Sequence, residues 1–222
     1  MAALRRIGLL GGTFDPIHVG HLDVARAAQR ELGLTAIHVL PSNVPPHRPQ
    51  PIASAYHRFA MSAIAVANAA GWRVSDLELR MPPPSYTANT LRHYHERGYA
   101  PGELFFLIGV DAFKDIQHWH DYPAVLDAAR FVVVSRPGFV TGTKSTPSPL
   151  HQRAVFIQAE TADVSSSAIR RARAEGRSIA GMVPPGVQQH IEQHGLYLPM
   201  PPDRRISARR DPIAADRLHG QN

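Results

Sequence analysis

The sequence predicts an α/β protein with a doubly wound parallel sheet and three layers, helix, sheet and helix. Short apolar runs bounded by Gly or Pro alternate with longer amphipathic stretches at intervals of ~15–30 residues, which is typical of strands joined by right-handed helical crossovers. At 222 residues, with 44% hydrophobic side chains, the chain fits one domain with a substantial core. No internal repeat or linker divides the first 198 residues.

The predicted elements follow from hydrophobic pattern and punctuation. The strands are expected at 7–10, 36–40, 72–79, 104–108, 131–134 and 155–157. The helices are expected at 22–28, 55–70 (with Phe59, Ala63 and Val66 inward), 87–95 (with Thr87 as N-cap), 112–119, 123–129, 168–175 (capped by Ser165, Ser166 and Ser167) and 186–194 (ending at Gly195). The proline-rich stretches 41–49 and 81–86 are expected to be loops, as is 141–150. Residues 199–222 combine proline and charge without apolar periodicity, so they are expected to form a disordered tail.

One stretch, Gly11–His21, carries the strongest local signal. It joins the first predicted strand to the first predicted helix through two glycines. The first N–H groups of a helix lack intrahelical partners, and the macrodipole places partial positive charge there, so this junction is a candidate anion site. His18 and His21 are three residues apart and therefore share one face of the opening helical turn. Two imidazoles there could donate hydrogen bonds to phosphate oxygens.

Composition excludes several classes of protein. The absence of cysteine rules out disulfides, thiolate catalysis and thiolate metal sites. No segment approaches the ~20 apolar residues that span a bilayer, and the N-terminus leaves no room for a signal peptide, so a cytoplasmic protein without membrane contact is expected. The net charge of +6 suits the steering of polyphosphates. No basic block with interleaved aromatics appears, so nucleic acid is not an expected partner.

The Gly11–His21 stretch resembles the first signature of the nucleotidyltransferase superfamily that carries the H-x-G-H motif. Its wording, G-G-T-F-D-P-I-H-V-G-H-L, is similar to the bacterial nicotinate-nucleotide adenylyltransferases. Four further segments resemble that family: 41–48, with Arg48 in place of the usual Lys; 85–91, S-Y-T-A-N-T-L; 108–111 with Trp119 and Arg136-Pro137-Gly138; and 164–170, V-S-S-S-A-I-R. The resemblance covers nearly the whole chain before the predicted tail and implies a Rossmann-like nucleotidyltransferase fold.

The resemblance implies a reaction: ATP and nicotinate mononucleotide give nicotinate adenine dinucleotide and pyrophosphate, as a step of NAD biosynthesis. Family enzymes transfer the adenylyl group directly, without a covalent intermediate. The attacking group is a phosphate monoester, so no strong base is required. Catalysis then consists of aligning two anions and neutralising charge as pyrophosphate leaves.

The resemblance also implies residue roles. His18, His21 and Arg170 are the expected catalytic residues. The expected ATP contacts are Gly11, Gly12, Thr13, Phe14, His18, His21, Gly109, Asp111, Ser166, Ser167, Ile169 and Arg170. The expected mononucleotide contacts are Thr13, Ser42, Arg48, Tyr86, Thr87, Trp119 and Arg136. Mg²⁺ is expected to arrive with ATP, and no dedicated protein metal site is expected.

Alternative interpretations remain at this point. Pantetheine-phosphate adenylyltransferase shares the fold and the first signature, and a non-catalytic nucleotide-binding protein could use the same scaffold. The pairs His93/His95 and His118/His120 have spacings that invite a metal interpretation, but no neighbouring carboxylate set supports it, so they are expected to be surface histidines. The preference between nicotinate and nicotinamide mononucleotide, a possible homo-oligomer and the role of the basic tail stay open.

Overall fold

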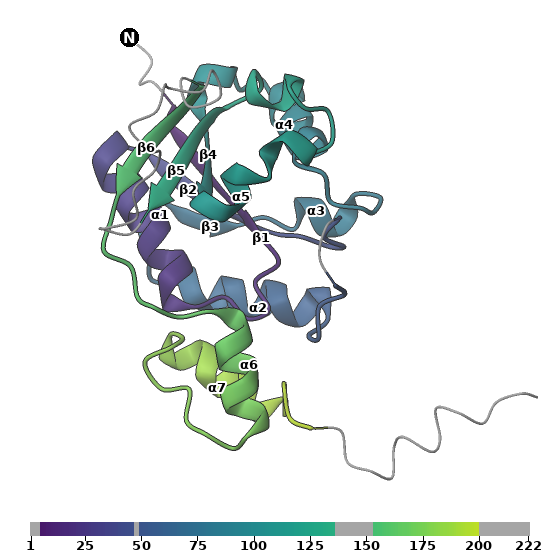
Figure 1. The fold of residues 1–222 in the computed structure, drawn as a ribbon, viewed down its shortest axis with the longest axis vertical. Coiled ribbons are helices and arrows are strands. Elements are labelled where there is room, and N and C mark those ends of the chain that lie inside the picture. Colours follow the sequence, from purple (N-terminus) through teal and green to yellow (C-terminus); the bar gives the residue numbers. More distant parts are fainter. Residues whose placement is uncertain (1–4, 47–48, 136–152, 200–222) are drawn as a thin grey trace, which may run out of the picture.

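The computed structural model describes residues 5–46, 49–135 and 153–199. Its centre is one six-stranded parallel sheet in the order β3-β2-β1-β4-β5-β6 (Figure 1). The strands are β1 (Ile7–Gly12), β2 (Ala36–Pro41), β3 (Trp72–Val74), β4 (Leu104–Gly109), β5 (Arg130–Ser135) and β6 (Ala154–Gln158). The predicted fold class is confirmed. The strand order reverses between β1 and β4, and ligands of open α/β sheets bind at the carboxyl ends beside such a reversal.

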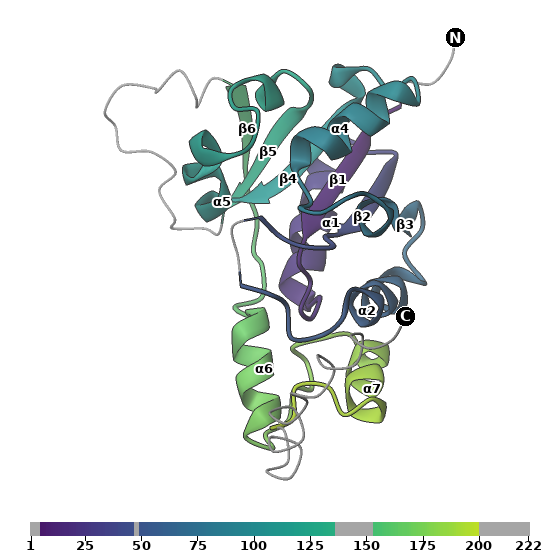
Figure 2. The ribbon, with the colours of Figure 1, turned by 90° about the vertical axis from the view of Figure 1, so that its right-hand side faces the viewer.

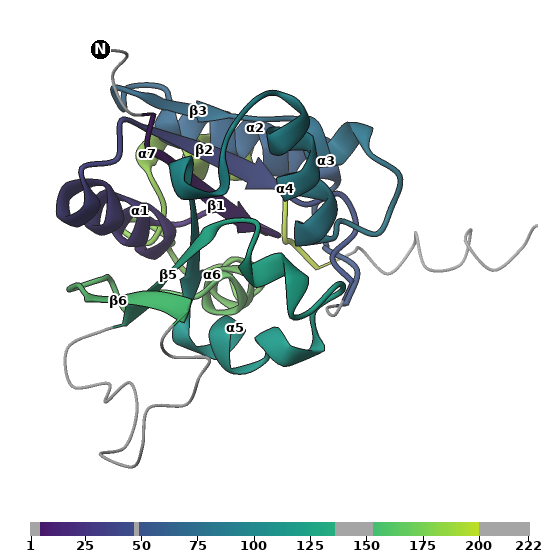
Figure 3. The same ribbon diagram turned by 90° about the horizontal axis from the view of Figure 1, so that it is seen from above.

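Helices cover both faces of the sheet (Figures 1 and 3). The α-helices are α1 (Val19–Leu32), α2 (Ala55–Val66), α3 (Leu77–Arg80), α4 (Thr87–Glu96), α5 (Val110–Lys114), α6 (Ser166–Ala174) and α7 (Pro185–Gln193). Short 3₁₀ turns are η1 (Pro101–Glu103), η2 (Ile116–His118) and η3 (Ala124–Leu126). Leu10 faces a core shared with α1, α2, α6 and α7, whereas Leu9 faces a core shared with α3, α4 and α5. Alternate residues of β1 thus serve opposite layers, as the two-residue period of a strand requires.

Helices α6 and α7 lie beyond the carboxyl ends of the strands (Figures 1 and 2). Gly186 shows how closely α7 packs on α2, because a Cβ atom there would lie 2.7 Å from Cγ2 of Ile64. None of the described helices has both the length and the apolar character needed to cross a bilayer.

Several predicted elements were wrong in extent. The strand expected over 72–79 ends at Val74, because Ser75 Oγ accepts the amide of Leu77 and a local turn begins α3. The helices expected over 112–119 and 123–129 are shorter: α5 and η2 replace the first, and η3 the second.

The remaining corrections concern helix ends and faces. Tyr86, not Thr87, is the N-cap of α4. The predicted inward stripe of the 55–70 helix was wrong in part. Val66 is buried as expected, but Phe59 and Ala63 are only half-buried. The helix ends at Val66, and its other buried residues are Arg58, Met61 and Ser62. Of the predicted tail, only Pro199 lies among the described residues, and the loop predicted over 141–150 lies outside them.

Candidate active site at the carboxyl ends of β1 and β4

The paired histidines stand at the start of α1, directly beyond β1. The His18 and His21 rings stack with their centroids 3.6 Å apart and their planes 23° apart. The ring of Phe14 meets His21 edge-on at 5.0 Å. Phe14 has a left-handed backbone (φ +50°) and folds back over Gly12, where an added Cβ would lie 2.8 Å from the Phe14 ring. Gly12 is therefore required for the ring arrangement that holds His21.

One hydrogen bond indicates which nitrogen of the neutral His21 ring carries the proton. The backbone N–H of His18 donates to Nδ1 of His21 over 3.2 Å. A nitrogen that accepts carries no proton, so the neutral imidazole of His21 holds its proton on Nε2. His21 thus presents an N–H donor from Nε2.

The expected anion site at the first amides of α1 needs a partial correction. The N–H of Val19, the first residue of the helix, donates to the carbonyl of Met182 over 3.1 Å. That donor is already used by the C-terminal segment. The Val19 amide is therefore not available to a phosphate, whereas the imidazoles of His18 and His21 lie at the same start of α1.

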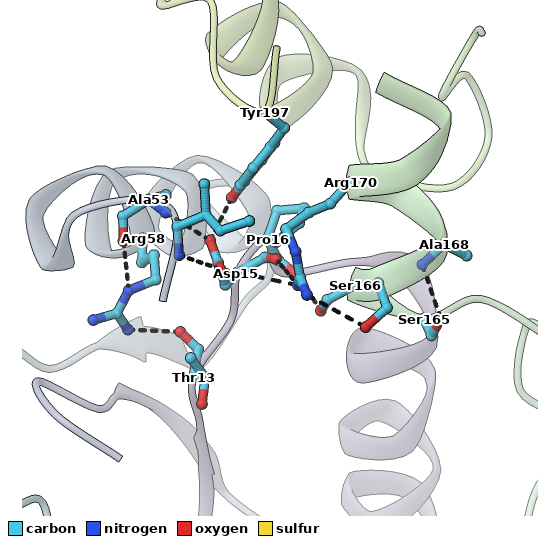
Figure 4. A network of polar contacts seen from close by, with 12 residues as sticks. Thr13, Asp15, Pro16, Ala53, Arg58, Ser165, Ser166, Ala168, Arg170 and Tyr197 are labelled. Carbon is cyan, nitrogen blue, oxygen red and sulfur yellow. Dashed lines mark hydrogen bonds and ion pairs between the residues drawn. The ribbon is translucent and has the colours of Figure 1, made fainter. Parts of the chain in front are cut away.

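Asp15 organises the loop between β1 and α1 (Figure 4). Its buried carboxylate accepts the amides of Ile52 (2.8 Å) and Ala53 (3.0 Å) and the hydroxyl of Tyr197 (2.8 Å). Nη1 of Arg170 lies 3.9 Å from the carboxylate and donates to the backbone carbonyl of Asp15 over 2.7 Å. This one side chain therefore joins the first loop, the start of α2, α6 and the C-terminal segment.

Helix α6 brings the second predicted signature against the first. Ser166 Oγ donates to the carbonyl of Pro16 over 2.9 Å, and Arg170 Nη2 donates to Ser167 Oγ over 3.3 Å. Ser165 caps the helix by accepting the amide of Ala168, as predicted for this serine run. The N-terminus of α6 thus lies beside the histidine loop.

Ile169, one of the expected ATP contacts, lies in the core of the protein. Its side chain is 0% exposed in the core, and its amide donates to the carbonyl of Ser165. The side chain of Ile169 is thus used in core packing, and its amide is used in the helix.

Arg58 is a second organising residue and, like Asp15, is absent from the predicted site. It is 1% exposed and donates to four backbone carbonyls: Ala53 (3.2 Å), Thr13 (2.6 Å), Ser42 (2.6 Å) and Asn43 (2.9 Å). Burial lowers the pKa of its guanidinium, while the nearby Asp15 carboxylate opposes that shift. Arg58 therefore fixes the loops after β1 and β2 relative to α2. Figure 4 shows its hydrogen bonds to Thr13 and Ala53.

The segments expected to receive the mononucleotide also meet. The amide of Asn43 donates to Ser85 Oγ over 2.9 Å, and the Ser85 amide donates to the carbonyl of Val44 over 2.9 Å. Tyr86 stacks on His120 with centroids 4.2 Å apart. The loop after β2, the start of α4 and the turn containing Trp119 therefore form one contiguous group.

Ser42 and Trp119 have contrasting surroundings. Ser42 is buried, and among the described residues no hydrogen-bond partner reaches its Oγ. This hydroxyl at the end of β2 can therefore form a hydrogen bond with a ligand. Trp119 is half-buried and meets Phe106 and Phe131 edge-on at 6.1 and 6.2 Å. A Cβ at Gly11 would lie 3.1 Å from the Phe106 ring, which links Trp119 to the end of β1 through one side chain.

The remaining predicted site residues lie at the end of β4 or outside the described chain. Gly109 is exposed, and a Cβ there would meet nothing within 4 Å, so folding does not require a glycine at this position. The Asp111 side chain is 92% exposed and lies 3.7 Å from Lys114. Arg48 and Arg136 lie outside the described residues.

Among the histidines, His118 and His120 are exposed as expected, but His93 and His95 are half-buried. His95 Nδ1 shares a hydrogen bond with the carbonyl of Tyr99 over 2.8 Å. The structure thus gives His95 a place in local packing.

Comparison with known proteins gives consistent results. Residues 9–172 match the cytidylyltransferase-like family model. A Thermus thermophilus protein described as a probable nicotinate-nucleotide adenylyltransferase is 42% identical over 192 residues, covering 86% of this chain and 99% of its own. A Roseiflexus protein with the same description is 38% identical over 195 residues, covering 86% and 97%. Plasmodium falciparum nicotinic acid mononucleotide adenylyltransferase, solved with NaAD, shares the fold with a TM-score of 0.66 at 19% identity, covering 87% of this chain and 97% of its own.

Proposed function

Because this chain belongs to the nicotinate-nucleotide adenylyltransferase family within the cytidylyltransferase-like proteins, we infer that it transfers the adenylyl group of ATP to nicotinate mononucleotide. The products are nicotinate adenine dinucleotide and pyrophosphate, and the reaction is a step of NAD biosynthesis. A phosphate oxygen of the mononucleotide attacks the α-phosphorus of ATP as the bond to the β-phosphate oxygen breaks. Both partners are anions, so alignment and charge neutralisation are the main requirements.

His21 is proposed as the main donor to the reacting phosphate. Its Nδ1 accepts the His18 amide, which directs the proton of the neutral ring to Nε2. The stack with His18 and the edge contact with Phe14 hold the ring in place. A donor held in position before the reaction costs no reorganisation when negative charge develops on the phosphate. His18 is proposed to contact the same α- and β-phosphate region.

The N-terminus of α6 is proposed to hold the outer phosphates. Ser166 and Arg170 already bind the loop that precedes the histidines, and Ser167 accepts a hydrogen bond from Arg170. With 27% of its side chain exposed, Arg170 can reach a ligand while keeping its bond to the Asp15 carbonyl. Gly109 allows adenosine to approach the end of β4, and Asp111 is proposed to bind the ribose hydroxyls.

The mononucleotide is proposed to occupy the group formed by the β2 loop, the α4 start and the Trp119 turn. Ser42 Oγ offers a buried hydroxyl, and Trp119 offers a ring for stacking on the pyridine. The backbone at Tyr86 and Thr87 is proposed to bind the pyridine carboxylate. Arg48 and Arg136 stay predictions for phosphate contacts.

Mg²⁺ is proposed to enter with ATP. Among residues 5–46, 49–135 and 153–199, the groups of three or more candidate ligands do not include a set of carboxylates, and the Asp15 carboxylate is occupied by backbone amides and Tyr197. Mg²⁺ commonly takes most of its ligands from water and substrate phosphates, where it neutralises charge. The protein's own contribution is to bind and orient those phosphates.

The observation that carries this proposal is the contact between the histidine loop and α6 through Asp15 and Arg170. The test is pyrophosphate release from ATP with nicotinate mononucleotide, nicotinamide mononucleotide and phosphopantetheine in parallel. Release is expected with a pyridine mononucleotide, the nicotinate form being favoured. Release with phosphopantetheine alone would assign the chain to the other adenylyltransferase, and binding without release would indicate a nucleotide-binding protein.

A further inference from the structure

Three histidines meet where the start of α2 lies against the end of α7. His57 lies in the first turn of α2, and His190 and His194 lie at the carboxyl end of α7. Their ligand nitrogens all lie within 4.8 Å of one another, and Nδ1 of His57 is 3.1 Å from Nε2 of His190. The third ring, that of His194, lies 4.9 Å from His57 and 4.4 Å from His190 between centroids.

The geometry of α7 and its packing on α2 bring the three histidines together. His190 and His194 are four residues apart and therefore lie on one face at the end of the helix. At the other end of α7, Gly186 packs so closely on Ile64 that a Cβ would clash at 2.7 Å. Since Gly186 begins α7 and Ile64 ends α2, the two helices run antiparallel and the histidines meet at the opposite end of the same interface.

The chemistry of the group suits a divalent transition metal. Neutral imidazole is the form that binds metal, and three histidines with an open fourth position form a known zinc ligand set. Zn–N bonds of about 2.0–2.1 Å place tetrahedral ligands about 3.3 Å apart, so small ring rotations would bring all three nitrogens into range.

We propose that His57, His190 and His194 form a binding site for Zn²⁺ or a similar borderline divalent ion, with water as the fourth ligand. The ion would hold α2 against α7. The start of α2 adjoins Ile52 and Ala53, whose amides bind Asp15, and Tyr197 follows His194 by three residues. The metal would therefore stabilise the two segments that hold the Asp15 carboxylate.

The test uses the full-length chain without a histidine tag, stripped of metal and then dialysed against Zn²⁺ alone. One equivalent is expected to bind with micromolar or tighter affinity. Each of His57→Gln, His190→Gln and His194→Gln is expected to weaken binding at least tenfold. His118→Gln removes an exposed histidine elsewhere and is expected to leave binding unchanged. Circular dichroism of the metal-free variants checks that each one is folded.

Two readouts independent of catalysis complete the test. Co²⁺ is expected to give the visible absorption of a tetrahedral site in the wild type and to lose it in His190→Gln. The Tm is expected to rise with Zn²⁺ concentration in the wild type and in His118→Gln, but not in His190→Gln. Less than one equivalent bound by the wild type, or binding that survives all three substitutions, would overturn the proposal.

Discussion

Tyr197 donates a 2.8 Å hydrogen bond to Oδ1 of Asp15, joining two residues that are 182 positions apart. Tyr197 itself has a left-handed backbone (φ +63°), and its ring is buried. Burial, and then the adjacent Asp15 carboxylate, raise the pKa of the phenol, so it remains a donor. An uncommon backbone conformation is retained here because the hydroxyl and ring are both fixed.

The Tyr197→Phe variant removes only that hydroxyl. Hydrogen bonds to a charged group contribute about 1.5–3 kcal/mol, and a loss of that size in the free energy of unfolding is expected. Urea denaturation measures it. Tyr56→Phe, at a side chain whose residue is 83% exposed, is the matched control and should leave the midpoint unchanged. Equal midpoints for both variants would show that the bond to Asp15 adds no stability.

His21→Ala removes the proposed Nε2 donor. Loss of one donor to a developing charge costs ~3 kcal/mol, so kcat is expected to fall at least a hundredfold while the fold is kept. Steady-state pyrophosphate release measures this, with the exposed His118→Ala as control. An unchanged kcat in folded His21→Ala would remove this residue from the mechanism.

Trp119→Ala removes the proposed stacking surface. KM for the mononucleotide is expected to rise about tenfold, equivalent to ~1.4 kcal/mol, while KM for ATP stays nearly constant. Trp119→Phe keeps an aromatic ring beside Phe106 and Phe131 and should lose less. A similar rise for both substrates would instead indicate that Trp119 acts only through packing.

Arg58→Met leaves four carbonyl acceptors without their donor, two in buried and two in part-buried hydrogen bonds. Unsatisfied buried groups cost about 1–3 kcal/mol each, so a loss of at least ~3 kcal/mol in unfolding free energy is expected after relaxation. Arg58→Lys should recover only part of it, because an ammonium lacks the planar fork. Arg30→Met, at a side chain 71% exposed, is the control. Comparable stability for Arg58→Met and Arg30→Met would contradict the organising role.

His38 makes stability depend on pH. It is buried in β2 and shares a 2.7 Å hydrogen bond with the Tyr94 hydroxyl. Burial, and then the charge of Arg73, lower its pKa from 6.5 to about 4. Between these values the unfolded chain binds a proton that the folded chain does not, so stability falls as pH drops from 6.5 towards 4.

From pH 7 to pH 5 this group is expected to remove about 1–2 kcal/mol from the unfolding free energy. Urea midpoints at the two pH values measure the loss, and the difference should shrink in His38→Gln. The same pH dependence in both proteins would assign the acid sensitivity to other groups.

The fold was predictable because strands in a parallel sheet are short apolar runs, and those of β1, β2, β4, β5 and β6 are distinct in the sequence. Element ends were less predictable. The turn that ends β3 depends on one side-chain hydrogen bond, that of Ser75. Of the two predicted N-caps, Ser165 caps α6 as expected, whereas Thr87 does not cap α4, because capping depends on the local geometry of each helix start.

The organising residues of the site were missed for a different reason. Asp15 and Arg58 act through partners distant in sequence, which no spacing reveals. A signal existed for each: Asp15 lies inside the first signature, and Arg58 is a charge aligned with Met61 and Ser62 on the inward face of α2. The pair His190/His194 had helical ligand spacing, but the third histidine came from 133 residues away.

The loop between β1 and α1 is held from residues 166, 170, 182 and 197. During synthesis that loop leaves the ribosome early, whereas the residues that hydrogen-bond to it are translated near the end of the chain. The loop can therefore make these hydrogen bonds only after α6 and the segment that contains Tyr197 have been made. The loop between β1 and α1 is therefore completed late, and a chain cut short before Tyr197 would lack the hydrogen bond from Tyr197 to Asp15 in that loop.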